Sequence, residues 1–190
     1  LLILTTVRGD LLDTWQRSLP PDTPDHFLIN IQPHETAALT ALLERHGIAQ
    51  PQLFPMIRGR LLAINDRPVD PDAFDSPRAR RLATREFNLS LGNALQADNR
   101  VVAGRWWRAT GTHQDGVLAT GLAQTLAIKL GDRLRFDIAG NIVTAPVTSL
   151  RSVRWDSFNA NFFVVGTPHL LAGQPATYIS SFHLGAQDAL

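Results

Sequence analysis

One strand-rich stretch, residues 117–165, constrains the fold more than any other part of the chain. Within it, residues 133–138 alternate between apolar and charged side chains, which is the period of a strand with one buried face. The apolar members are Leu134, Phe136 and Ile138, and the charged members are Arg133, Arg135 and Asp137. A short helix is expected over 121–128, and further β-rich runs over 142–153 and up to 165. The stretch therefore predicts a small sheet onto which the rest of the chain packs.

Upstream, the sequence predicts a β-α-β unit over residues 27–64. A short buried strand at 27–31 is followed by a helix from Pro33 to His46, since proline is tolerated in the first turn and Gly47 favours a stop. Residues 53–64 then form a strand, or two strands interrupted at Arg58-Gly59. Further strands are expected at 85–91, 100–103 and 176–184. These patterns predict an α+β fold of two lobes, in which the middle of the chain is inserted into a β-α-β frame completed by the last strands.

The first residues predict a helix over 1–19, followed by a stiff proline-rich linker. Its apolar positions are Leu4, Leu11, Leu12, Trp15 and Leu19. Residues 1–7 are apolar but too few to span a bilayer, which needs about 20 residues. They are either an amphipathic helix packed on the domain or the end of a membrane helix, and periodicity does not choose between these.

Composition excludes several classes of function. The net charge of +1 gives no argument for a nucleic-acid partner. The chain has no cysteine, which excludes disulfides, thiolate catalysis and cysteine-bound metal. It has no Walker-type phosphate loop, so it cannot hydrolyse ATP by itself. Its six histidines show no pair at metal-ligand spacing, and no metal or cofactor is expected.

Two polar patterns favour structural interpretations. Ser181 and His183 share one face of the predicted last strand, but a hydrolase would also need an acid and an exposed Gly-x-Ser-x-Gly turn, which is absent. The basic run at 77–81 contains Arg78, Arg80 and Arg81. Because several aspartates lie nearby, a solvated face with local ion pairs is favoured over a lipid or nucleic-acid patch. The sequence therefore indicates a non-enzymatic chain, with a hydrolase as the weaker alternative.

The aromatic side chains are the candidate contact residues. They are Trp106, Trp107, Trp155 and Phe158. In a strand, the adjacent residues Trp106 and Trp107 would point to opposite faces, one into the core and one outward. Their ordinary role would be packing within and between lobes. The alternative is an apolar surface that contacts a lipid-like cargo or a sister domain.

Several segments resemble the large extracytoplasmic domain of FtsX-like ABC transporter permeases of the MacB type. The closest resemblance is to many-helix bacterial permeases that carry two such domains. The segments are GRWW (104–107), GLAQTLAIKLGDRLRFDIAG (121–140), VTSLRSVRWDSFNANFFVV (147–165) and ATYISSFHL (176–184), with support from residues 8–33 and 54–69. The chain departs from the pattern at Ala119-Thr120, where an acidic pair is usual, and at Gly166-Thr167.

The resemblance implies a division of the chain. Residues 1–25 would be a stalk helix and linker leaving the membrane. Residues 26–70 and 147–190 would form a porter-like β-α-β lobe, and residues 71–146 an inserted β-rich, sabre-like lobe. Residues 1–7 would then be the end of a membrane helix.

The resemblance also implies a function. The chain would face the periplasm from the bacterial inner membrane and pass ATPase-driven motion of membrane helices to periplasmic partners or to hydrophobic or lipid-type cargo, for export or extraction. Its partners would be its own transmembrane helices, a cytoplasmic ABC ATPase subunit, the sister periplasmic domain, and a periplasmic protein or lipid cargo. The alternative is a free-standing envelope protein that binds a lipid or a small molecule.

Overall fold

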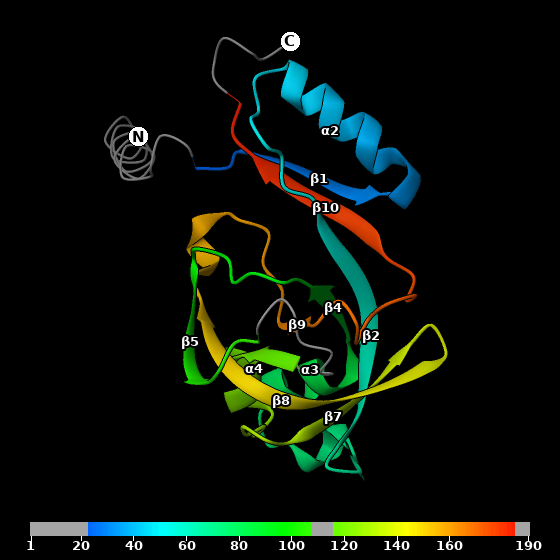
Figure 1. The fold of residues 1–190 in the computed structure, drawn as a ribbon. Coiled ribbons are helices and arrows are strands. Elements are labelled where there is room, and N and C mark those ends of the chain that lie inside the picture. The colour runs from blue at the N-terminus through cyan, green and yellow to red at the C-terminus, as the bar shows by residue number, and fades with distance from the viewer. Residues whose placement is uncertain (1–22, 108–115, 185–190) are drawn as a thin grey trace, which may run out of the picture.

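A computed structural model describes residues 23–107 and 116–184, with only the backbone described for 116–120. The predicted stalk helix and most of the linker lie outside the described residues. The fold is α+β, as predicted: one large, mainly antiparallel sheet carries a few short helices (Figure 1). Within the described part, no helix is both long and apolar enough to cross a bilayer.

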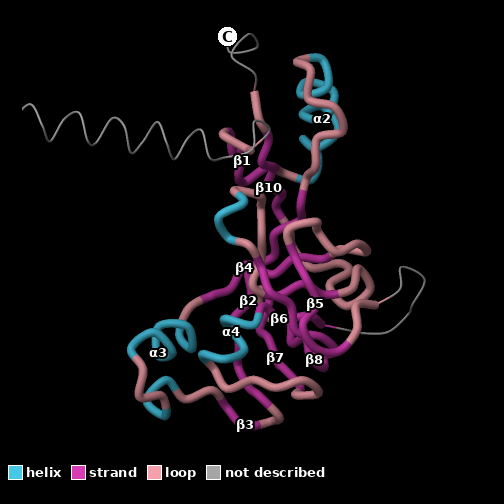
Figure 2. Tube along the Cα trace, turned by 90° about the vertical axis from the view of Figure 1, so that its left-hand side faces the viewer, coloured by secondary structure: helices cyan, strands magenta, loops and turns pink. Residues whose placement is uncertain are grey.

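The first unit of the chain is the predicted β-α-β arrangement. Strand β1 (His26–Ile31) leads through the 3-10 turn η1 (Pro33–Glu35) into α2 (Thr36–Arg45), and β2 (Phe54–Ile64) follows. The last strand, β10 (Thr177–Phe182), lies between β1 and β2 and is antiparallel to both. Strand β2 is continuous, so the single strand predicted over 53–64 forms and the alternative pair interrupted at Arg58-Gly59 does not. Strand β1 forms where predicted, but the burial expected for it is wrong, because Phe27 and Ile29 are exposed on this edge strand. Figure 2 shows β1, β10 and α2 at one end of the molecule.

The remaining strands form a closed ring. Pairing runs from β2 to β4 (Glu86–Leu91), β9 (Val164–Gly166), β6 (Gly116–Ala119), β8 (Asn141–Val153) and β7 (Arg133–Ile138), and β7 pairs with β2 again. The β4–β9 and β6–β8 pairs are parallel, and the others are antiparallel. Strands β3 (Arg67–Pro68) and β5 (Asn99–Gly104) extend the ring at β2 and β8. Only β2 belongs to both the ring and the β1–β10 extension within the described sheet.

The core lies on the buried faces of the ring strands. Its largest fully buried apolar residues are Ile57, Phe87, Leu89, Leu122 and Ile138. The alternation read from residues 133–138 is confirmed, because Leu134, Phe136 and Ile138 are buried while Arg133 is exposed. The short helix α4 (Thr120–Thr125) adds Leu122 and Ala123 to this core. The sheet predicted from this stretch is therefore present, and its buried residues contribute to one core shared with β2 and β4.

The basic run at 77–81 lies in a helix that the sequence pattern did not indicate. Helix α3 (Pro77–Thr84) is capped at its N-terminus by Ser76, whose Oγ accepts from the Ala79 backbone N–H at 3.5 Å. Its arginines are exposed, which confirms the solvated face. The expected local ion pairs are not recorded among the described residues, and Arg80 donates instead to the Asp75 backbone carbonyl at 3.1 Å.

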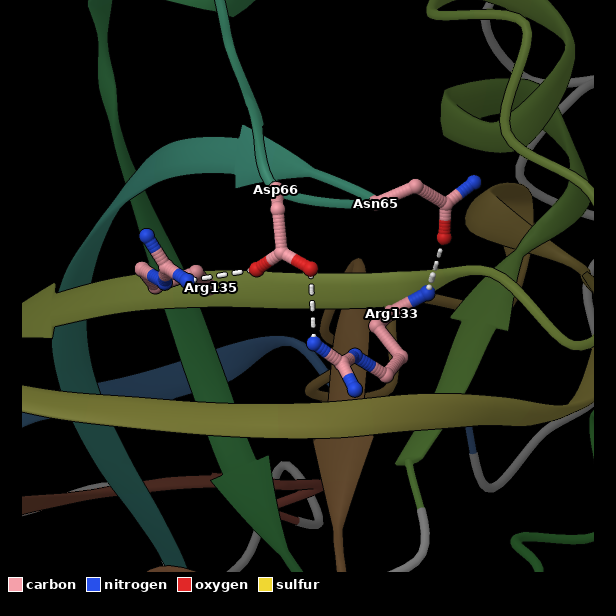
Figure 3. Close-up of polar contacts among 4 residues, drawn as sticks. All are labelled: Asn65, Asp66, Arg133 and Arg135. Atoms are coloured by element: carbon pink, nitrogen blue, oxygen red, sulfur yellow. Dashed lines mark hydrogen bonds and ion pairs between the residues drawn. The ribbon is translucent and has the colours of Figure 1, made fainter.

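The two-residue turn that joins β2 to β3 makes side-chain contacts with the neighbouring strand β7 (Figure 3). Asn65 and Asp66 both have positive φ, as a tight β-hairpin turn requires. The Asn65 side-chain oxygen accepts from the Arg133 backbone N–H at 2.8 Å, and Asp66 pairs with the guanidinium groups of Arg133 and Arg135 at 2.7 and 2.5 Å. These ion pairs are exposed, so we attribute positioning to them more than stability.

Gly104 ends β5 where two backbones come very close. Its φ is +73°, and a Cβ at this position would lie 2.1 Å from the Thr148 carbonyl oxygen. Gly140, in the turn between β7 and β8, has a similar φ of +87° with nothing within 4 Å. A side chain would therefore suffer backbone strain at both positions, but steric overlap only at position 104.

We expect Gly104→Ala to destabilise the chain far more than Gly140→Ala. Positive φ costs a side chain about 1–2 kcal/mol, and this cost applies to both variants. The overlap with Thr148 adds to the cost only at position 104. Urea unfolding of the two variants measures the difference, and equal losses of unfolding free energy would contradict the described path of the chain after β5.

Candidate functional site

Two of the candidate contact residues form a stacked pair. Trp106 and Trp107 follow Gly104, beyond the end of β5, and their rings stack with centroids 4.2 Å apart and an interplanar angle of 24°. Their indole N–H groups donate to the carbonyls of Asn93 at 3.2 Å and Gly92 at 3.0 Å. Because β5 has ended before these residues, alternation between the two faces of a strand does not apply to them. Trp107 is buried at 8% exposure, and Trp106 is partly exposed.

The other two candidates lie on the segment after β8. Trp155 is in the 3-10 turn η3 (Trp155–Ser157) and is 52% exposed. Its ring contacts Phe163 at 5.0 Å, and Phe163 in turn meets the buried ring of Phe87 edge-on at 6.3 Å. Phe158 ends η3 with a φ of 58° and is partly buried. Trp155 is thus the exposed end of an aromatic row that runs into the core.

The four candidates come from two segments of the chain. Ring contacts join Trp106 to Trp107 and Trp155 to Phe163. The first pair rests on the loop after β4, and the second on the loop after β8. The two segments come close together, because Asn161 and Phe162 of the second line the same small pocket as Trp106.

A buried polar cluster holds the segment that carries Trp155 and Phe158. Arg151, on β8, is 2% exposed. Its guanidinium donates to the side-chain oxygen of Asn99 and to the Phe162 backbone carbonyl, while its Nε has no partner among the described residues. Arg151 therefore connects β8 to β5 and to the end of the 154–163 segment.

Asp98 supplies the negative charge of this cluster. Its carboxylate accepts from the side-chain amides of Asn99 and Asn161, each at 2.8 Å, from Asn159 at 3.2 Å, and from the Ser157 hydroxyl. Its backbone carbonyl accepts from the Arg154 N–H at 3.1 Å. Both ends of the 154–161 segment are thus tied to one residue.

Burial and hydrogen bonding shift the pKa values of Asp98 and Arg151. Burial would raise the pKa of Asp98, but the hydrogen bonds from Ser157, Asn161, Asn159 and Asn99 outweigh it and hold that pKa below its usual value. Burial lowers the pKa of Arg151 to about 10, and the Asp98 charge opposes this change. Both groups are therefore charged at neutral pH, and their mutual attraction offsets part of the cost of burying Arg151.

Sequence reasoning missed this cluster, although one signal for Arg151 was present. Ala145, Val147, Ser149 and Arg151 alternate along β8, and all four are buried. An arginine that continues an inward-facing series has to meet acceptors inside the protein. Nothing in the local sequence indicates that Asn99 and Asp98, some fifty residues earlier, supply them.

A cleft lies beside the Trp106 site. It has a volume of about 510 Å³ and separates the end of β10 at Ser181 from the loop after β4. Apolar residues on its walls are Phe54, Ala94, Leu95 and Ala97. A smaller pocket of about 70 Å³ adjoins it and includes Trp106 and Arg151 in its lining. The cleft therefore combines apolar walls with polar groups, which come from Gln52, Gln96, Asp98, Asn159 and Ser181.

The residues of the hydrolase alternative make other contacts. The Ser181 hydroxyl accepts from the Ala160 backbone N–H at 3.2 Å. His183 follows β10 and its Nδ1 lies 3.1 Å from an Asp25 carboxylate oxygen. Among the described residues, no group of three or more His, Asp or Glu side chains could hold a metal ion.

We expect Asp98→Asn to remove stability that depends on pH. Because the folded-state pKa of Asp98 is depressed, its contribution is present above the ordinary value of 3.8 and is lost as the pH falls through the folded value. The variant should lose about 1 kcal/mol at pH 7, a figure discounted because the carboxylate is only partly buried. Urea unfolding between pH 7 and pH 2.5 should show this gap closing on acidification. The matched control is Asp156→Asn, on exposed η3, and a gap that stays constant with pH would contradict the assignment.

Comparison with known proteins places these features in context. No protein-family model matches the chain. A curated relative, the uncharacterized ABC transporter permease YbbP of Escherichia coli (strain K12), is 38% identical over 182 residues, which cover 96% of this chain and 22% of that permease. A solved structure, described only as a permease-protein domain from Porphyromonas gingivalis, has 12% identity and a TM-score of 0.42 over 78% of this chain and 67% of its own. The chain is therefore similar, over nearly its whole length, to about one fifth of an ABC transporter permease.

Proposed function

We propose that this chain is a periplasm-facing domain of an FtsX/MacB-type ABC transporter permease. In this role it passes ATPase-driven motion of membrane helices to periplasmic partners or to hydrophobic or lipid-type cargo. The observation that carries the proposal is the 38% identity to an ABC transporter permease over 96% of the chain. Identity at that level over a whole domain supports a transporter component, and the FtsX/MacB type rests on the sequence resemblance.

The position of the first and last described strands supports a role as an inserted domain. Strands β1 and β10 are antiparallel neighbours, with His26 opposite Phe182. The described chain therefore enters and leaves the sheet side by side, as Figure 1 shows. A domain with adjacent ends can be inserted between two membrane helices without a long connection.

Continuous strands supply a path for force. Strand β2 pairs with β10 through Phe54–Met56 and with β4 and β7 along the rest of its length. We propose that the inserted lobe of 71–146 meets the porter-like lobe of 26–70 and 147–190 at residue 147. Strand β8 runs through this boundary without a break. Motion at the β1–β10 end would then reach the distant end through backbone hydrogen bonds and not through a flexible linker.

We assign contact with a partner to Trp155 first. Its ring is 52% exposed, and the cluster around Asp98 and Arg151 fixes the backbone that carries it. A rigid, exposed aromatic residue loses little entropy on binding, which suits an interface. Trp106 and Phe158 are partly exposed and would contribute at the edge of a contact, while Trp107 serves packing.

A second function is favoured by the cleft. Its apolar walls and volume of about 510 Å³ suit a lipid or small-molecule ligand of a free-standing envelope protein. Such a protein would bind its ligand without an ATPase. Ligand binding by the isolated chain would favour this second function, whereas ligand binding only in the full-length permease would favour the leading proposal.

Photo-crosslinking in the full-length permease tests the leading proposal. A photoreactive residue at position 155 should crosslink to the sister domain or to a periplasmic partner, and the yield should differ between the nucleotide-free and ATP-bound transporter. A matched probe at Ile142, which is 58% exposed on the β7–β8 hairpin, is the control. Crosslinking that is absent at 155, or that ignores nucleotide at both positions, would refute the assigned interface.

A further inference from the structure

A further cavity lies at the end of the molecule opposite to β1 and β10. Its volume is about 530 Å³, and its lining comes from the β2–β3 turn, the 3-10 turn η2 (Pro71–Ala73) with its flanking residues, and the loop between α4 and β7. Figure 2 shows β3 at this far end. The lining does not include Trp106, Trp107, Trp155 or Phe158. This cavity is therefore separate from the aromatic candidates and from the cleft beside β10.

The inner part of the cavity is apolar. It is formed by Ile64, Val69 and Phe74, which are partly buried and pack against the core cluster of the ring. Pro68 and Ala73 add apolar atoms on the exposed side. An apolar group of a ligand that enters the cavity can therefore be removed from water against side chains whose other faces are already packed.

Asp132 connects two walls of the cavity. Its Oδ1 accepts from the Asn65 side-chain amide at 2.8 Å, and its Oδ2 accepts from the Lys129 backbone N–H at 2.7 Å. The Asn65 side-chain oxygen is itself bound by the Arg133 backbone N–H at 2.8 Å. These bonds hold the β2–β3 turn against the loop between α4 and β7. The walls are therefore formed before a ligand arrives, which lowers the entropic cost of binding.

Two cations in the lining have unused donors. Within the described part of the chain, the side chains of Arg67 and Lys129 make no hydrogen bond or ion pair, and both residues are exposed. The two carboxylates in the lining are already engaged: Asp132 by the bonds above, and Asp70 by the Asp72 backbone N–H at 2.9 Å. These aspartates balance the formal charge of the two cations. A preference for an anion therefore comes from the free N–H donors and not from net charge.

We propose that this cavity binds the C-terminal carboxylate and the last apolar side chain of a partner polypeptide. The carboxylate accepts from the guanidinium of Arg67 and the ammonium of Lys129, and the apolar side chain lies against Phe74. A phosphate group would bring nearly two negative charges close to Asp70 and Asp132, whereas a carboxylate brings one, so the carboxylate fits better. The site does not depend on the proposed transporter role. Within that role, its place at the end away from β1 and β10 suits contact with a periplasmic partner.

Two matched peptides test the site on the 190-residue chain. The probes are N-acetyl-Ala-Leu-Phe with a free C-terminal carboxylate and the same peptide with a C-terminal amide. In two-dimensional amide NMR titrations, the acid should shift the backbone signals of Asn65, Ala127 and Lys129, which line the cavity. It should bind about tenfold more tightly than the amide, because hydrogen bonds to a charged acceptor are stronger than those to a neutral one.

Variants assign the preference to the two cations. Arg67→Gln and Lys129→Gln should each weaken binding of the acid about three- to tenfold and leave binding of the amide unchanged. The matched control is Arg100→Gln, which removes an exposed arginine of β5 outside the cavity and should change neither affinity. All three side chains are exposed, so the variants should remain folded, and unchanged amide signals from the ring strands would show this.

Several results would overturn the proposal. Equal affinity for the acid and the amide would exclude recognition of the carboxylate. Full binding of the acid by Arg67→Gln and Lys129→Gln would exclude the assigned donors. Absence of signal shifts at the cavity with the acid at millimolar concentration would exclude the site. Acetate that binds as tightly as the acid would leave an anion site without recognition of a polypeptide, which also contradicts the proposal.

Discussion

The double pairing of β2 is the constraint on which the structure depends. One strand of eleven residues lies in the closed ring of β2, β4, β9, β6, β8 and β7 and also carries the β1–β10 extension. Its buried residues, including Ile57 and Leu61, belong to the core cluster of the ring. Because a one-residue slip would turn these side chains outward, the register of β2 is strongly fixed. The register of β2 in turn sets where β10, and with it β1, can lie.

The polar cluster around Arg151 fixes the conformation of an irregular segment, whereas the core supplies apolar burial. Residues 154–163 have little regular structure, yet they carry both Trp155 and Phe158. Apolar packing is not directional, whereas hydrogen bonds to Asp98 and Arg151 specify particular backbone positions. Burying the guanidinium, with Nε left without a recorded partner, costs stability. The cluster therefore specifies the conformation of residues 154–163 at some cost in the free energy of folding.

The two ends of the molecule differ in how they are stabilised. The ring has a continuous apolar core, while the β1–β10 end leaves Phe27 and Ile29 largely exposed and is joined by the backbone ladder of the two strands, with polar contacts of Asp25 beside it. Local stability is therefore expected to be highest in the ring and lowest where the chain enters and leaves.

The sequence by itself determined the local elements. The period of two in residues 133–138 and the proline and glycine signals around α2 act between near neighbours, so these predictions were confirmed. The apolar run at 27–31 does form strand β1, but its predicted burial was wrong, since Phe27 and Ile29 are exposed. The tertiary structure alone decided the closure of the ring, the stacking of Trp106 on Trp107, and the meeting of Asp98 with Asn161. These contacts join residues by way of chain reversals whose direction depends on the whole core. The physical reason is that local propensity fixes the backbone of a segment, while its partners are chosen by the packing of all the segments together.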